Sequence, residues 1–176
     1  MLDVLMKRAV QTFFQKERAN ILNGVAERNL CARLALYIEL EMERVGFQGY
    51  YADVEYNRKQ NGAVKTIMDD EYKIIRINCD LILHSRCEIV QRDNLIAVEM
   101  KKIERPQYEK ESDVNRLRAM TKKKYDDIWS FDGETHPEHV CGYEYGYFLE
   151  IDNVNMNYNI ITIVEGEVIN QFNSLF

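Results

Sequence analysis

Two acidic residues and a lysine interrupt apolar runs in the middle of the chain. Asp80 stands immediately before one run, Glu99 lies inside another, and Lys101 lies at the end of that second run. If residues 94–101 form a strand, its side chains alternate between two faces. One face then carries Leu95, Ala97, Glu99 and Lys101, and the other carries Ile96, Val98 and Met100. Burying charges in an apolar strand is costly unless they are paired or bind a metal ion. The placement therefore indicates a site.

Length and composition favour one folded domain, which we place at residues 1–176. The chain has 176 residues, 46% hydrophobic and 11% aromatic, and this composition is typical of a globular protein rather than a disordered one. It contains no apolar run long enough to cross a membrane, and its first residues carry no signal-peptide pattern. We therefore expect a protein without a membrane partner.

Cysteine usage favours a reducing compartment, and we expect a cytoplasmic location. The four cysteines form no CxxC pair and do not resemble a disulfide framework; they are Cys31, Cys79, Cys87 and Cys141. His136, His139 and Cys141 lie close together and are soft metal ligands. A zinc site there is one interpretation, and polar loop residues ahead of a strand are the other.

Charge is distributed unevenly along the chain. The formal net charge of −6 argues against a surface coated for non-specific nucleic-acid binding. Between Lys101 and Lys124, however, nine basic residues stand against four acidic ones, a local balance of +5. Such a block either binds phosphates or forms a solvated helix face. The basic residues we single out for nucleic-acid binding are Lys102, Arg105, Arg116, Lys122, Lys123 and Lys124.

Two helices are predicted ahead of the first strand. Apolar residues recur at three-and-four spacing over residues 2–16, which predicts an amphipathic helix. A second helix is predicted from an N-cap at Asn23 to about Val45, ending at Gly46. Glu27 lies on or beside the core-facing side of this helix. It is either a site residue or a first-turn acid that favours the helix dipole.

The remaining pattern alternates strands, loops and one helix. We expect a strand over 49–58, a loop over 59–72, and strands over 73–84 and 94–101. A helix over 112–124, capped by Ser112 or Asp113, is followed by a loop containing Trp129. A strand over 139–151 and a hairpin of 159–164 with 167–172 complete the chain. The order predicts an α/β fold with a central mixed β-sheet flanked by helices.

The acidic residues and the lysine occur in a recognisable order: Glu27 on a helix, then Asp80, then Glu99-Met-Lys101. With the strings around them, they resemble the PD-(D/E)XK, or restriction-endonuclease-like, nuclease superfamily, in an uncharacterised bacterial subgroup. The resemblance covers about residues 27–125. Its strings are the helix 27–39, Val54-Glu-Tyr-Asn-Arg58, Cys79-Asp-Leu-Ile-Leu-His84, Asn94-Leu-Ile-Ala-Val-Glu-Met-Lys-Lys102 and Asp113-x-x-Arg-Leu117. One departure is Cys79, where that superfamily usually has proline.

The resemblance implies a restriction-endonuclease-like core and a nuclease that uses Mg²⁺ or Mn²⁺, acting on DNA. Asp80 and Glu99 would be metal ligands, with the Met100 backbone carbonyl as a third and Glu27 approaching directly or through a water. Lys101 would hold the attacking water or stabilise charge at the phosphate. Glu55 would support the site from the preceding strand. Lys102, by strand alternation, faces away from it.

Three alternatives remain open at this stage. Lys101 could pair with Glu99 or Asp80 in a purely structural ion pair. The chain could be a non-catalytic nucleic-acid-binding or protein-interaction module on the same fold, or a metal-dependent hydrolase of a small phosphate ester. We also expect two apolar surfaces, the strand 143–148 and the N-terminal helix, to be able to serve a homodimer.

Overall fold

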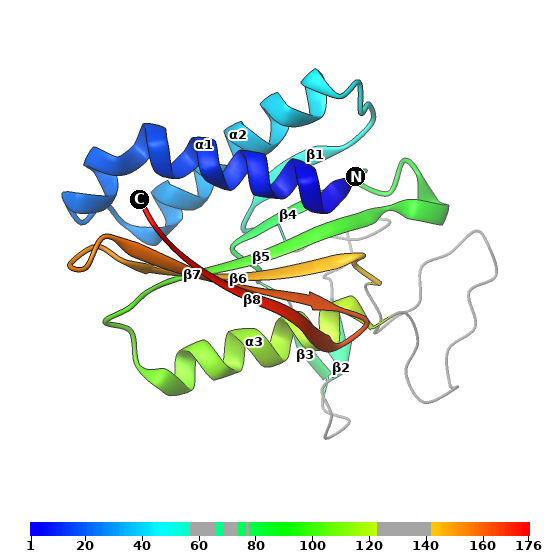
Figure 1. The fold of residues 1–176 in the computed structure, drawn as a ribbon. Helices are drawn as coiled ribbons and strands as arrows, with labels where there is room; N and C mark the ends of the chain where they lie inside the picture. The colour runs from blue at the N-terminus through cyan, green and yellow to red at the C-terminus, as the bar shows by residue number, and fades with distance from the viewer. Residues whose placement is uncertain (57–65, 69–73, 77, 123–141) are drawn as a thin grey trace.

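The computed structural model describes residues 1–56, 66–68, 74–76, 78–122 and 142–176. Six strands form one sheet in the order β1-β4-β5-β6-β7-β8 (Figure 1). They are β1 (Tyr51–Val54), β4 (Leu81–His84), β5 (Asn94–Lys102), β6 (Tyr145–Asp152), β7 (Asn157–Val164) and β8 (Glu167–Leu175). Among these strands, β5 and β6 pair in parallel and the other neighbours pair antiparallel. The predicted α/β class with a mixed sheet is confirmed.

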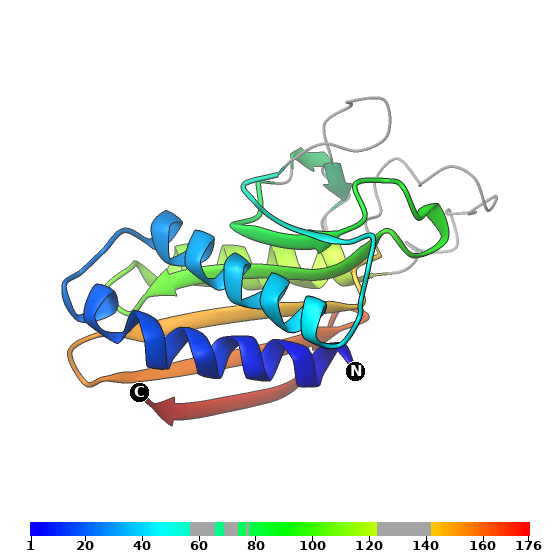
Figure 2. The same cartoon turned by 90° about the horizontal axis from the view of Figure 1, so that it is seen from above.

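Helices cover both faces of this sheet. Helices α1 (Leu2–Leu22) and α2 (Glu27–Arg44) lie side by side on one face, and α3 (Gln107–Thr121) lies on the other (Figures 1 and 2). A parallel pair of strands needs a long crossover connection, and α3 belongs to the connection between β5 and β6. A separate two-stranded sheet pairs β2 (Thr66–Met68) with β3 (Ile74–Arg76), and a short 3-10 turn, Val90–Arg92, precedes β5. Helix α3 is thus brought against the face of β5 that carries Glu99.

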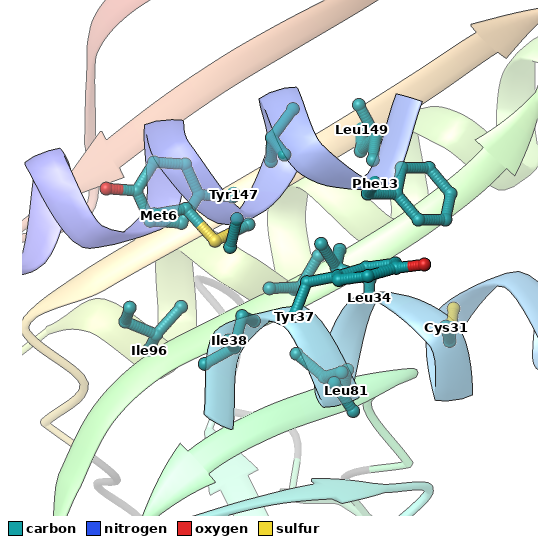
Figure 3. Close-up of a cluster of buried hydrophobic side chains, with 14 of the residues drawn as sticks. Met6, Phe13, Cys31, Leu34, Tyr37, Ile38, Leu81, Ile96, Tyr147 and Leu149 are labelled. Carbon is teal, nitrogen blue, oxygen red and sulfur yellow. The ribbon is translucent and has the colours of Figure 1, made fainter. Parts of the chain in front are cut away.

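The larger core lies between the sheet and helices α1 and α2. Their apolar stripes meet the strands there, because burying apolar surface is the main stabilising term in folding. Figure 3 shows this packing, with Phe13 from α1 and Leu34 from α2 fully buried over the strands. Side chains of this core that Figure 3 labels include Met6, Cys31, Tyr37, Ile38, Leu81, Ile96, Tyr147 and Leu149.

A smaller core lies beneath α3. It contains Ile82 and Ala97 from the sheet and Leu117 and Met120 from the helix. Gly146 on β6 allows this helix to approach closely, because a Cβ at that position would lie 3.1 Å from the Thr121 methyl group and 3.3 Å from the Leu117 Cβ. The glycine is therefore a packing requirement of the α3 face.

Strand alternation in β5 follows the prediction with one exception. Ile96, Val98 and Met100 join the α1/α2 core, and Ala97 joins the α3 core. Leu95 was expected beside Ala97 but belongs to the α1/α2 core. The register of the β4–β5 pair shifts at this point, from Leu83 opposite Ile96 to His84 opposite Asn94. Such an irregularity breaks the two-residue alternation.

The predicted helix ends differ from the observed ones. Helix α1 runs to Leu22 rather than 16, and Asn23 is its C-terminal cap rather than the N-cap of α2. Gly24 then takes the left-handed conformation, with φ of +73°, that commonly ends a helix. Helix α3 begins at Gln107, after Pro106, rather than at 112. Pro106 fixes the entry to the helix, so Asp113 is an interior helix residue and not a cap.

Three strand predictions also need correction, and one is confirmed. The predicted strand 73–84 is two strands, β3 and β4, in different sheets, and the predicted loop 59–72 contains β2. The first strand, expected over 49–58, is β1 alone within the described residues 49–56, and residues 57 and 58 lie outside the described ranges. The closing hairpin is confirmed as β7 and β8, joined at Glu165 and Gly166, which both have positive φ. Trp129 and its loop lie outside the described residues.

No helix in the described ranges is long and apolar enough to cross a membrane.

Candidate functional site

Asp80 is fixed beside Glu99 by the pairing of β4 with β5. Leu81 lies opposite Val98 in this antiparallel pair, so the residue before Leu81 falls next to Glu99. The backbone N–H of Met100 donates a hydrogen bond of 2.9 Å to Asp80 Oδ2. Two carboxylates from neighbouring strands are therefore held side by side, as the sequence predicts.

Lys101 and two residues of α3 complete the cluster. Lys101 Nζ lies 2.8 Å from Asp113 Oδ2 and 3.8 Å from Asp80 Oδ2. Arg116 Nη1 donates to Glu99 Oε1 at 2.5 Å and to Asp113 Oδ1 at 3.0 Å. The acidic cluster, as we call it, thus has three carboxylates and two cations: Asp80, Glu99, Asp113, Lys101 and Arg116. Lys101 pairs with two of these carboxylates, so the ion pairing expected from the structural alternative is present.

Burial divides the cluster into an inner part and an outer part. Glu99 is 1% exposed, whereas the side chain of Asp80 is 28% exposed and that of Lys101 is 15% exposed. Glu99 Oε2 is buried and accepts no hydrogen bond from any described residue. A buried polar atom without a partner is unfavourable. The inner carboxyl group therefore has one oxygen that no described residue satisfies, and the outer side chains of Asp80 and Lys101 are partly exposed to solvent.

The pKa shifts in the cluster have identifiable causes. The pKa of Glu99 is raised to about 8, chiefly by burial and also by the charges of Asp80 and Asp113, while Arg116 opposes the rise. For Lys101, burial alone would lower the pKa, but the bond to Asp113 and the charges of Asp80 and Glu99 raise it above its usual value. Lys101 therefore carries a positive charge at neutral pH.

Glu27 lies at the start of α2, near the end of β5. Its Oε1 accepts hydrogen bonds from the Lys102 backbone N–H at 3.0 Å and from Arg105 Nε at 3.1 Å, and its Oε2 accepts from Arg105 Nη2. Burial would raise the pKa of Glu27, but Arg105, the Lys102 N–H and the charge of Lys101 lower it. Glu27 thus contacts the strand one residue beyond Lys101 and is fully paired there. Its approach to a metal ion stays a prediction.

Glu55 supports Asp80 through the backbone rather than through its side chain. It follows β1 with φ of +53°, and its N–H donates to the Asp80 carbonyl at 3.1 Å. Its carboxylate pairs with Arg28, which follows Glu27 on α2. A left-handed conformation is uncommon for a residue with a side chain. The backbone of Glu55 thus helps to fix the position of Asp80, which immediately precedes β4.

The basic residues predicted to bind nucleic acid do not form one exposed patch among the described residues. Arg116 is inside the acidic cluster, Arg105 binds Glu27, and Lys102 donates to the Gly24 carbonyl at 2.9 Å. Lys122 lies against the β7–β8 turn at Gly166. Lys123 and Lys124 lie outside the described residues.

Asp113 and Arg116 are the site residues whose roles the sequence did not reveal. Asp113 was interpreted as a helix cap and Arg116 as a phosphate contact. Their spacing of three residues on a helix places both on one face. The signal available in the sequence was a Glu-x-Lys triplet in an apolar strand, followed closely by a predicted helix that carries an acidic and a basic residue on one side. The sequence does not show that β5 and β6 are parallel neighbours. It therefore does not indicate that the side of the helix with Asp113 and Arg116 faces β5.

The cysteines contribute no metal site among the described residues. Cys31 and Cys79 carry buried, free thiols. Burial raises the pKa of the Cys79 thiol well above its usual value, and this thiol donates to the Val98 carbonyl at 3.1 Å. Cys79 thus links the start of β4 to β5 by a hydrogen bond. It stands at the position where the superfamily that the sequence resembles usually has proline. His136, His139 and Cys141, where a zinc site was considered, lie outside the described residues.

The donor chemistry of the cluster fits a magnesium ion. In the part of the chain that the structure describes, no three His, Cys, Asp or Glu side chains converge to hold a metal. Mg²⁺, however, usually takes one or two carboxylates and completes its octahedron with water. Asp80 and Glu99 supply two adjacent carboxylates, and the unpaired Glu99 oxygen is of the hard type that this ion prefers. These donors therefore fit an ion that is bound by two carboxylates and completed by water, not an ion that is surrounded by protein ligands alone.

The two surfaces considered for a homodimer contribute to the packing inside the chain. Tyr143, Tyr147 and Phe148 are buried, and the apolar stripe of α1 packs on the sheet. A homodimer through either surface stays a prediction.

Comparisons with protein-family models, with curated proteins and with solved structures found no match to this chain.

Proposed function

We propose that this protein hydrolyses phosphodiester bonds, with DNA as the substrate, in a reaction that depends on a divalent cation at the acidic cluster. The observation that carries the proposal is the unpaired oxygen of buried Glu99, beside Asp80 and on the same strand face as Lys101. A carboxyl group buried in this way is neutralised either by a proton, which its raised pKa of about 8 allows, or by a cation that displaces that proton. A lysine and two carboxylates are the groups that metal-assisted phosphodiester hydrolysis uses.

Asp80 and Glu99 would hold Mg²⁺ or Mn²⁺, and the Met100 carbonyl stays the predicted third protein ligand. When bound, the cation stabilises charge on phosphate oxygens and lowers the pKa of a bound water. Asp80 is oriented for this role by the Met100 N–H, and its backbone is held by Glu55. The protein thus fixes one carboxylate from two sides before any ligand arrives.

Lys101 is the residue that would act on the reacting phosphate. Asp113 holds its ammonium group at 2.8 Å, within reach of Asp80. The raised pKa keeps the group protonated, so it can donate hydrogen bonds to a phosphate oxygen or orient the attacking water. DNA is the substrate we favour because of the resemblance over residues 27–125; most of the described residues of the basic block are paired within the chain and do not support this choice.

The proposal is tested by a cleavage panel of single-stranded, double-stranded and branched DNA and of RNA, with Mg²⁺, with Mn²⁺ and with chelator. We expect cleavage of a DNA substrate that chelator abolishes. Asp80→Ala, Glu99→Ala and Lys101→Ala should each reduce the rate by at least about a hundredfold, because each removes a group that acts on the transition state.

Glu150→Gln is the matched control. Glu150 lies opposite Lys101 on β6 and pairs with Lys110 at 2.7 Å, outside the acidic cluster. We expect its variant to retain activity. Cleavage that survives all three alanine substitutions would refute the site. A chain that cleaves nothing and binds no cation would be a non-catalytic module with a structural ion-pair network.

A further inference from the structure

Arg116 occupies the one oxygen of Glu99 that has a partner. Its guanidinium bridges Glu99 Oε1 and Asp113 Oδ1, while Glu99 Oε2 has no partner among the described residues. With all groups ionised, three carboxylates against two cations leave the acidic cluster with a net charge of −1, so it lacks one positive charge. An arginine cannot lose its proton in a protein, so this internal cation is present at every relevant pH.

We propose that Arg116 is an internal counter-cation that competes with the divalent cation for Glu99, and that cation binding moves the guanidinium off this carboxylate. The inference rests on the proposed function, because it assumes that Asp80 and Glu99 are the cation ligands. It adds a positioning residue on α3 that sets how tightly the cation binds.

The electrostatics of a small site favour such an exchange. A divalent cation bound by both oxygens of Glu99, or by one oxygen and Asp80, would place two positive centres on one buried carboxylate. Repulsion between the cation and a guanidinium 2.5 Å from Glu99 Oε1 weakens binding unless the arginine moves. Lys101 is held by Asp113 and lies near Asp80 instead.

Asp113 gives the displaced guanidinium a place to remain. It lies one helical turn before Arg116 and already accepts a bond of 3.0 Å from it. Arg116 is 24% exposed, so its side chain has a path toward solvent while it keeps the Asp113 contact. The exchange therefore needs a side-chain rearrangement and no change in the helix.

The test compares wild type with Arg116→Gln, which has a shorter side chain, keeps a hydrogen-bond donor and removes the charge. Affinity for Mn²⁺ is obtained from the rise of the thermal unfolding midpoint with cation concentration. We expect Arg116→Gln to unfold at a lower temperature without cation and to bind Mn²⁺ about tenfold to a hundredfold more tightly, because a charge-assisted hydrogen bond no longer competes. Arg118→Gln, on the same helix and outside the acidic cluster, should bind as wild type does.

A second measurement uses the unmodified chain, so the test stands even if Arg116→Gln does not fold. The ¹⁵Nε–H resonance of Arg116 should shift during a Mg²⁺ titration, with the same midpoint as binding, while that of Arg118 stays still. An Arg116 resonance that is unmoved at saturation, or an Arg116→Gln variant that binds no more tightly, overturns this inference. Wild-type binding that Glu99→Gln abolishes would still support the proposed function in that case. Absence of cation binding in wild type and in Arg116→Gln overturns both.

Discussion

At the scale of single residues, the structure contrasts two buried glutamates. Glu17 is 3% exposed and accepts hydrogen bonds from Asn20, Arg33 and Tyr37, so both of its oxygens are satisfied. Burial would raise the pKa of Glu17, but these three donors lower it below its usual value. Glu99 has one side-chain partner among the described residues, Arg116, and a pKa raised to about 8. The first glutamate links α1 to α2, and the second is the one that we propose as a cation ligand.

The lowered pKa of Glu17 predicts an acid-side loss of stability. Because the folded state keeps Glu17 ionised more readily than the unfolded state does, its contribution is present above the unfolded pKa of about 4.5 and is lost as pH falls through the lower folded pKa. We expect Glu17→Gln to cost about 1–3 kcal/mol at pH 7. Urea unfolding from pH 3 to pH 7 should show a shallower acid-side decline for the variant. Equal slopes would contradict the assignment.

At the scale of elements, sequence patterns predicted the presence of a strand more reliably than the residues at which an element ends or the element that it packs against. Strand 94–101 and the closing hairpin were predicted nearly as observed, because alternation and a Gly166 turn are local signals. The start of α3 was missed, because Pro106 sets it rather than the polar residues at 112 and 113. That error hid the role of Asp113, whose side chain points to Lys101 only when the residue lies inside the helix.

The contact between α3 and β6 makes a testable prediction at this scale. Gly146→Ala adds a Cβ that meets the Thr121 methyl group at 3.1 Å, and Thr121 is held in place because its hydroxyl accepts a bond from the Gly166 N–H. We expect a loss of about 1–3 kcal/mol in the free energy of unfolding, measured by urea denaturation.

The partner variant for this prediction is Thr121→Ser, which removes the obstructing methyl group and keeps the hydroxyl. The double variant Gly146→Ala with Thr121→Ser should cost less than the sum of the two single changes. Strict additivity would show that the two positions are not in steric contact.

At the scale of the whole molecule, the acidic cluster exists because of pairings between distant segments. Asp80 meets Glu99 through the antiparallel β4–β5 pair, and α3 reaches both through the crossover between parallel β5 and β6. Residue types and resemblance predicted the first meeting. The second depends on which face the crossover helix covers, and local periodicity carries no information about that. The sequence thus predicted Asp80, Glu99 and Lys101 as site residues. It did not predict that Arg116 pairs with Glu99 or that Asp113 pairs with Lys101.

The most direct test of the account is calorimetric titration of the chain with Mn²⁺, since the proposed function and the role of Arg116 both depend on a cation at Asp80 and Glu99. We predict binding by wild type that is lost in Asp80→Asn and in Glu99→Gln. Two controls should retain it: Glu17→Gln, the same change at a satisfied buried glutamate, and Asp53→Asn, an aspartate on β1 that pairs with Arg86 and His84. Binding that is unaffected by Glu99→Gln, or no binding by wild type, would contradict the account.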